Sequence, residues 1–193
     1  MTLSPRLSAL RDRLAASGME PLAAPWSEDA IAAFEAAHGV ALPPDYRAFL
    51  GAVGSSGPGP GYGLLAPEPT VFSGFPRVVT TIRSVDGSVV ESGTPVRPAF
   101  DSPSSVARPF PLFGTFEPLS PYDLPPLGPG ETPYDGTLTL CEHGCGYFDF
   151  LVVSGRYAGQ VWSDTMAAMR DGRIAPTGLG FLDWYERCLD EAT

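Results

Sequence analysis

The residues best suited to chemistry lie together in one short segment, Cys141-Glu142-His143-Gly144-Cys145. Two thiols and an imidazole are ligand types that zinc prefers, and a cysteine beside a histidine is also a pairing used in nucleophilic catalysis. A structural zinc site needs four ligands, however, and no second ligand pair accompanies this one. The only other thiol, Cys188, is expected on the face of a helix. The segment therefore predicts a turn with partly buried cysteines, and no metal or other cofactor.

The same segment does not predict catalysis. A nucleophilic cysteine needs an oriented base within hydrogen-bond reach, and residues this close on a hairpin usually point in incompatible directions. The second histidine, His38, precedes a helix-ending glycine, where it suits the helix C-terminus better than a role as a base. The chain shows neither a nucleophile-elbow pattern nor a phosphate-binding loop. We therefore predict no catalytic residues.

The formal net charge of −10 at pH 7 indicates what kind of partner the chain can bind. Binding to a phosphate backbone draws its affinity from clustered Lys and Arg, so direct binding to nucleic acid is not expected. An acidic surface keeps a protein soluble, and it also attracts basic proteins with association rates that fall as salt is added. The charge therefore favours a basic protein partner or simple solubility.

Length and composition indicate one domain without disulfides. A chain of 193 residues, 44% hydrophobic and 18% charged, is long enough to bury a core of its own. Three cysteines are too few, and odd in number, for a disulfide framework. The first residues lack the apolar core of a signal peptide, and no stretch reaches the roughly 18 apolar residues of a membrane span. We therefore expect a cytoplasmic protein with no membrane partner.

The elements that position these residues begin with three helices. Ser4 can cap a first helix, whose leucines recur on one face. Ser27 caps a second helix with an acidic first turn, and Gly39 ends it. A third helix begins at the Leu-Pro-Pro step that contains Pro44 and ends at Gly54. The N-terminal part therefore reads as a helical hairpin preceded by one more helix.

The middle of the chain, residues 55–133, reads as a loop-rich insert. Glycine or proline interrupts almost every candidate element there, which leaves only short strand-like pieces at residues 77–83 and 110–113. The insert is rich in phenylalanine, whereas disordered segments are poor in aromatic residues. We therefore expect the insert to wrap the core.

Regular structure returns after residue 136. The sequence TLTLC predicts a strand, GYFDFLVV its antiparallel neighbour, and residues 142–146 the turn between them. Residues 160–163 predict a third strand of the same sheet. A closing helix carries Phe181, Trp184, Tyr185 and Cys188 on one face, and its acidic residues are expected on the opposite, solvated side.

Alternation in the second strand supplies a candidate binding surface. Tyr147 and Asp149 fall on a mixed face, and Trp162 and Asp164 lie on the next strand. Aromatic anchors among charged residues suit protein recognition, so these four residues are predicted to form an acidic, aromatic patch for a partner. Alternatively, Tyr147 and Trp162 pack beneath the insert.

Several of these segments together resemble one known family. The phrase LPPDYRAFL follows a helix containing FEAAHGV, and GCGYFDFLVV, GQVWSD and FLDWYERCLDE come later in the chain. In this order they are similar to the SUKH superfamily, the SMI/KNR-like group that includes bacterial toxin-immunity proteins and fungal cell-wall regulators. The long insert and the extra first helix depart from the compact family pattern.

The resemblance implies an α+β fold with an antiparallel sheet and a binding role, commonly the neutralisation of a secreted nuclease or another polymorphic toxin. We expect a single SMI/KNR-like domain over residues 1–193, with a helical part at 1–54, the loop-rich insert at 55–135, and a sheet with a closing helix at 136–193. The favoured function is that of a non-catalytic, bacterial immunity-type protein that binds a basic toxin. The alternatives are a regulatory scaffold for endogenous proteins, and a small enzyme or zinc protein that uses Cys141 to Cys145.

Overall fold

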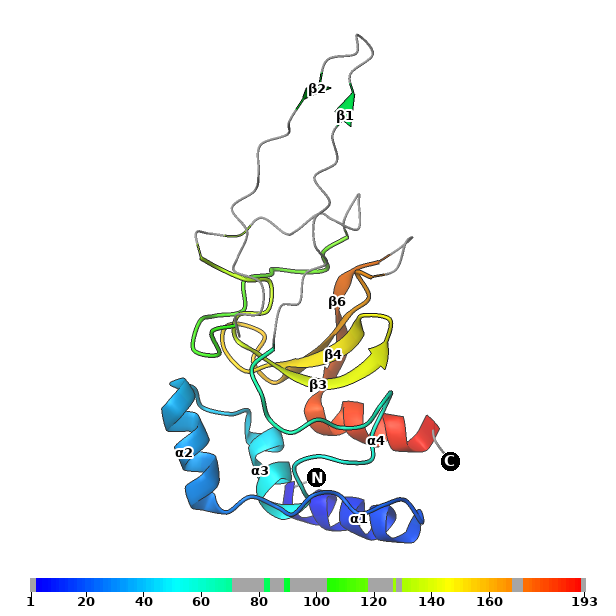
Figure 1. Cartoon of the computed structure of the whole chain (residues 1–193). Coiled ribbons are helices and arrows are strands. Elements are labelled where there is room, and N and C mark those ends of the chain that lie inside the picture. Colours follow the sequence, from blue (N-terminus) through cyan, green and yellow to red (C-terminus); the bar gives the residue numbers. More distant parts are fainter. Residues whose placement is uncertain are drawn as a thin grey trace.

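The computed structural model describes residues 3–70, 82–83, 89–90, 104–117, 127, 130–167 and 172–191. Within these residues, four helices and a four-stranded antiparallel sheet form an α+β fold, which confirms the predicted fold class. Figure 1 shows the helices gathered on one side of the sheet and irregular chain on the other. The sheet is therefore covered on both faces, by different kinds of structure.

The helices follow local signals in the sequence. They are α1 (Leu3–Ala16), α2 (Glu28–His38), α3 (Pro44–Ala52) and α4 (Phe181–Glu191). The Ser27 side chain caps α2 by accepting a hydrogen bond from the Ala30 N–H at 3.2 Å, and Gly39 ends it in the left-handed conformation with φ of 62°. Both ends of α2 are confirmed as predicted. In the described part of the chain no helix combines the length and apolarity that a membrane crossing requires.

The sheet is an antiparallel meander of four strands. They are β3 (Thr137–Gly144), β4 (Tyr147–Val152), β5 (Gln160–Asp164) and β6 (Ile174–Gly180), in the spatial order β3-β4-β5-β6. The first three match the predicted strands, whereas β6 was not predicted, because Pro176 and Gly178 interrupt its sequence. A strand with such residues is tolerated at a sheet edge, which is where β6 lies.

The hairpin between β3 and β4 is tighter than the sequence suggested. Residues Glu142 to Gly144, predicted as turn, continue β3, and the turn itself is Cys145-Gly146. Cys145 has φ of 55°, between two glycines whose φ values are 81°. The prediction of a turn over residues 142–146 was therefore too long at its start, and the structure extends His143 into the sheet.

A second, much shorter strand pair lies in the middle of the chain. β1 (Ile82–Arg83) pairs antiparallel with β2 (Val89–Val90). The strand predicted at residues 77–83 is confirmed only for its last two residues, since residues 77–81 lie outside the described part.

One face of the four-stranded sheet packs on the helices. Phe49 of α3 is fully buried and meets Phe181 and Tyr185 of α4 edge-on, with ring centroids 4.9 and 5.1 Å apart. Leu138 and Leu151 belong to the same cluster, so strand and helix side chains share one core. The apolar face predicted for α4 is confirmed.

The opposite face of the sheet packs under irregular chain. Phe110 and Tyr134 cover Phe150, Trp162 and Ile174 in a second core cluster. The expectation that the insert wraps the core holds for its described residues 104–117, but the strand predicted at residues 110–113 was wrong. That segment forms no strand, although the Phe110 N–H donates to the Ser154 carbonyl at 3.0 Å.

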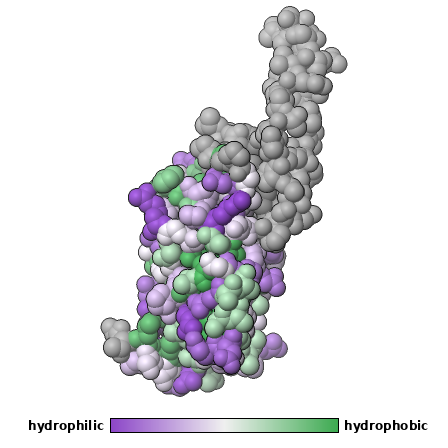
Figure 2. Space-filling model, turned by 90° about the vertical axis from the view of Figure 1, so that its left-hand side faces the viewer, coloured by the Kyte–Doolittle hydropathy of each residue, from purple (hydrophilic) through white to green (hydrophobic). Residues whose placement is uncertain are grey.

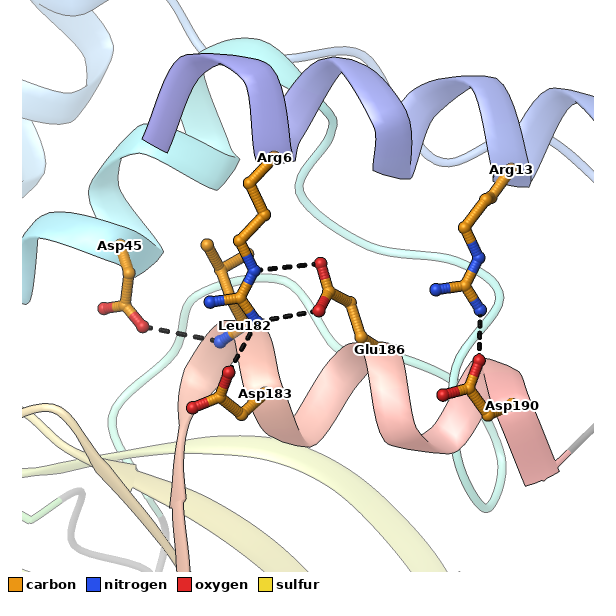
Figure 3. Close-up of polar contacts among 7 residues, drawn as sticks. All are labelled: Arg6, Arg13, Asp45, Leu182, Asp183, Glu186 and Asp190. Atoms are coloured by element: carbon orange, nitrogen blue, oxygen red, sulfur yellow. Dashed lines mark hydrogen bonds and ion pairs between the residues drawn. The ribbon is translucent and has the colours of Figure 1, made fainter. Parts of the chain in front are cut away.

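Helix α1 lies alongside α4 and is joined to it by ion pairs (Figure 3). Arg6 donates to both carboxylate oxygens of Glu186, at 3.0 and 2.7 Å, and also to Asp183 at 2.6 Å. About two helical turns further along α1, Arg13 donates to Asp190 at 2.5 Å. The acidic side of α4, predicted to be solvated, is therefore paired with an additional helix.

Candidate functional site

Three side chains with chemistry of their own meet near the end of the β3–β4 hairpin. Cys141 and His143 are two residues apart in β3, so strand alternation places both on one face. Asp149 of β4 is the direct cross-strand partner of Cys141, and direct partners also share a face. A register shift between Glu142 and Gly144 leaves His143 outside the ladder and bends the strand. The fold therefore directs all three side chains to one point.

The atoms that could act chemically are close together. The Cys141 Sγ lies 3.4 Å from the His143 Nε2 and 3.9 Å from the Asp149 Oδ2. The same His143 Nε2 lies 3.2 Å from the Asp149 Oδ2. Cys141 and Asp149 are buried, whereas the His143 side chain is 35% exposed. The cluster is therefore internal, with one side open to solvent at the imidazole.

Asp149 is held by two further donors from separate elements. The Ser163 hydroxyl of β5 donates to its Oδ1, and the Trp184 Nε1–H of α4 donates to its Oδ2 at 3.0 Å. A buried carboxylate needs such partners, because its charge has been removed from water. The orientation of the carboxylate is thus fixed by two side chains outside the cluster.

This geometry does not resemble that of an activated cysteine nucleophile. In such a site one ring nitrogen of the histidine faces the thiol and the other faces the orienting acid. Here a single nitrogen, the His143 Nε2, faces both. Burial, and then the charge of Asp149, raise the pKa of Cys141 far above its ordinary value, so its thiol stays protonated at neutral pH. Burial and Asp149 also raise the pKa of Cys188, to about 11.

A loop from the N-terminal half lies against the same end of the hairpin. The Tyr62 N–H donates to the Glu142 carbonyl at 2.8 Å, and the Leu65 N–H donates to the Leu140 carbonyl at 2.7 Å. The segment then continues along the free edge of β3 to Pro69. Gly144 has φ of 81°, a backbone conformation that favours glycine, and it lies in contact with the Tyr62 hydroxyl.

The four residues predicted to bind a partner do not form one surface patch. Tyr147 is half-buried, and Asp149 points toward α4 through its bond to Trp184. In the register between β4 and β5, Trp162 pairs with Phe150 and Asp164 pairs with Phe148. Trp162 and Asp164 therefore lie on the other face of the sheet from Asp149. A role for these residues in partner binding stays a prediction, but Asp149, Trp162 and Asp164 are buried in the structure.

The alternative position considered for Trp162 is the one observed. Its ring is fully buried and meets Phe110 of the insert edge-on, with centroids 4.9 Å apart. Asp164, only 2% exposed, accepts hydrogen bonds from the Tyr134 hydroxyl and, at 2.6 Å, from the Met166 N–H. Burial raises the pKa of Asp164 from its ordinary value, although both hydrogen bonds oppose the shift.

The residue that sequence reasoning missed is the third member of the cluster, Asp149 as a partner of Cys141 and His143. In the sequence the metal-ligand types lie between Cys141 and Cys145, yet Cys145 lies in the exposed turn and outside the cluster. The signal that could have found Asp149 was the hairpin itself, because pairing two strands brings a residue of the second beside the first.

Comparison with known proteins supports the family resemblance in one part of the chain. A search of curated proteins and a search of solved structures found no match. The model of the SMI1 / KNR4 family (SUKH-1) matches residues 25–91, about a third of the chain, which include α2, α3 and the loop at Tyr62. Cys141, His143 and Asp149 lie outside this segment. The predicted resemblance to the SUKH superfamily is thereby confirmed over residues 25–91.

Proposed function

We propose that the chain is a single, non-catalytic protein-binding domain of the immunity type, which binds and neutralises a polymorphic toxin such as a basic nuclease. The observation that carries this proposal is the family match over residues 25–91, since the SUKH superfamily includes toxin-immunity proteins. The net charge of −10 supports a basic partner, because an acidic inhibitor can imitate the phosphate backbone that a nuclease binds.

A surface beside β3 offers the best contact region for such a partner. We call it the β3-edge surface and define it by Tyr62, Leu65, Glu68 and Glu142. Tyr62 is 78% exposed, and backbone hydrogen bonds hold its loop against the strand. Glu68 and Glu142 are exposed, and no ion pair joins either of them to another described residue. An aromatic anchor beside unpaired carboxylates suits recognition of a basic protein.

Three exposed acidic residues of the helices are less available to a partner. Glu28 of α2 is paired with Arg47, and Asp183 and Asp190 of α4 are paired with arginines of α1. On the face of the molecule drawn in Figure 2, hydrophilic and hydrophobic residues are interspersed, so that face does not by itself select an apolar docking site. The β3-edge surface therefore combines exposure, aromatic area and free charge.

The first test is affinity capture of the tagged chain from its own host, followed by an activity assay of what is captured. We expect one basic polypeptide near a one-to-one ratio, released by high salt, whose activity falls to background when one equivalent of the chain is added. Capture of several endogenous proteins, none with an activity that the chain inhibits, would instead favour the regulatory scaffold.

The β3-edge surface is tested by charge reversal with a matched control. The double variant Glu68→Arg, Glu142→Arg should slow association with the captured polypeptide about 10-fold or more at low salt, and the difference should shrink as salt is added. Glu117→Arg is the control for one reversed charge, because Glu117 is also exposed but follows Phe116, which pairs with β6 at the opposite sheet edge. Equal association rates in stopped-flow measurements for the double variant and the control would exclude this surface.

A further inference from the structure

We propose that Cys141, His143 and Asp149 form a binding site for a divalent transition metal ion, with Zn²⁺ the best match and one coordination position open to solvent. This inference is independent of the proposed function, because it rests on side chains outside the segment that matches the family. It also differs from the zinc site that the segment from Cys141 to Cys145 suggested, since Asp149 takes the place of Cys145 as a ligand.

The separations between the three ligand atoms match the edges of a coordination tetrahedron. Zinc bonds of about 2.3 Å to sulfur and about 2.0–2.2 Å to nitrogen or oxygen place tetrahedral ligand atoms about 3.4–3.6 Å apart. The Cys141 Sγ lies 3.4 Å from the His143 Nε2 and 3.9 Å from the Asp149 Oδ2. The His143 Nε2 lies 3.2 Å from the same Oδ2. An ion could therefore be bound with adjustments of a few tenths of an ångström.

The carboxylate already has the support that metal ligands require. Ser163 holds the Asp149 Oδ1, and Trp184 holds the Oδ2 from α4, so the side chain is oriented from both sides. Groups that orient a ligand in this way are a regular part of metal sites and raise their affinity. Oδ2 is the oxygen that lies near both Cys141 and His143, so it is the atom that would bind an ion.

Without an ion, three polar groups crowd the Oδ2 of Asp149. The Trp184 Nε1 lies 3.0 Å away, the His143 Nε2 3.2 Å and the Cys141 Sγ 3.9 Å. A carboxylate oxygen offers about two lone-pair directions, so three polar groups cannot all be well placed around it. An ion at the centre would replace the contacts of Oδ2 with His143 and Cys141 by one metal–oxygen bond, and leave the bond from Trp184 intact.

The ligand types select the kind of ion. A thiolate, an imidazole and a carboxylate suit Zn²⁺ and its neighbours in the transition series, whereas Mg²⁺ and Ca²⁺ prefer oxygen ligands alone. Binding would deprotonate Cys141, with its proton released to solvent, and would leave His143 neutral. The partly exposed imidazole supplies the entry side and the open position.

The test uses the untagged full chain, reduced and freed of metal by a chelator. Titration with Co²⁺ should give a saturable one-to-one complex with a thiolate-to-cobalt charge-transfer band and the visible spectrum of a tetrahedral ion. Competition with a chromophoric chelator should give a Kd for Zn²⁺ below about 1 μM. Zn²⁺ should also raise the thermal unfolding midpoint by at least about 3 °C.

Two variants locate the ion. His143→Ala should weaken Zn²⁺ binding at least about 10-fold, while its metal-free unfolding midpoint stays within about 2 °C of the wild type, since the ring is partly exposed. Cys145→Ser is the matched control, an exposed thiol two residues further along, and should bind Zn²⁺ as the wild type does. Absence of one-to-one binding, a cobalt spectrum without the thiolate band, or loss of binding in Cys145→Ser but not in His143→Ala would overturn the proposal.

Discussion

Asp149 and Asp164 are two buried carboxylates on adjacent strands, yet they lie on opposite faces of the sheet and in different surroundings. Asp149 faces the helices, where Trp184 of α4 and the partly exposed His143 both reach it. Asp164 faces the irregular chain and is enclosed by the Tyr134 hydroxyl and a backbone N–H. The chemistry open to each carboxylate is thus decided by the structure that covers its face of the sheet.

The two faces also differ in how they exclude water. The helix-covered face is closed by amphipathic elements whose apolar stripes interlock, as with Phe49 and Phe181. The loop-covered face is closed by single aromatic side chains from irregular segments, chiefly Phe110 and Tyr134. If each face is closed by a packed core, removal of one buried ring should lower the free energy of unfolding by a similar amount on either face.

The largest effect is expected from truncating one phenylalanine on each face. Phe49→Ala and Phe110→Ala should each lower the free energy of unfolding by about 3–5 kcal/mol, because each ring is buried and packs edge-on against other rings. Chemical denaturation of the two variants measures this directly. A loss below about 1 kcal/mol for Phe110→Ala alone would mean that the irregular chain lies loosely on its face.

A smaller effect is expected from Asp164 when the pH changes. Burial raises its pKa in the folded state, so the folded protein takes up a proton while the unfolded chain is still ionised. Stability gained from this group therefore increases as the pH falls through the raised pKa, and is complete below the ordinary value of 3.8. Asp164→Asn should lack this gain. Between the raised and the ordinary pKa of Asp164, the free energy of unfolding of the variant should fall behind that of the wild type by up to about 1.4 kcal/mol for each unit by which the pH is lowered.

The measurement is the free energy of unfolding at several pH values from neutral down toward 3.8, for the wild type and Asp164→Asn. Asp12→Asn, at an exposed position of α1, controls for the loss of one charge. Identical pH dependence of the wild type and Asp164→Asn would show that enclosure by the loop-covered face does not perturb the pKa of this carboxyl.

The helix-covered face was largely predictable because its signals are local. The Ser27 cap and the Gly39 stop define α2 within a few residues, and the 3.6-residue period of α4 identifies its buried side. The loop-covered face was not predictable, since no periodic pattern in the sequence marks Phe110 or Tyr134 as core residues. Strand β6 was missed for a related reason, because its edge position removes the constraints that exclude Pro176 from inner strands.

The candidate site depended on pairing that one sequence does not define. Alternation correctly separated Phe148 and Phe150 from Asp149, but the register with β5 decides that Asp164 lies opposite Phe148. A shift by one residue would have placed both carboxylates on the same face, as the predicted patch required. In the same way, Cys141 meets Asp149 only through the register of the β3–β4 hairpin.

The smallest effect is expected at the outer layer of the helix-covered face, where α1 is joined to α4. Arg6→Ala should lower the free energy of unfolding by about 1 kcal/mol, because its guanidinium makes a two-bonded pair with the half-buried Glu186. Arg13→Ala is the matched control and should cost less than about 0.5 kcal/mol, since its single pair with Asp190 is exposed. Both values come from chemical denaturation at low salt. Because surface pairs are screened by ions, the difference between the variants should decrease at high salt, and a difference independent of salt would mean that Arg6 acts through the packing of its aliphatic stem instead.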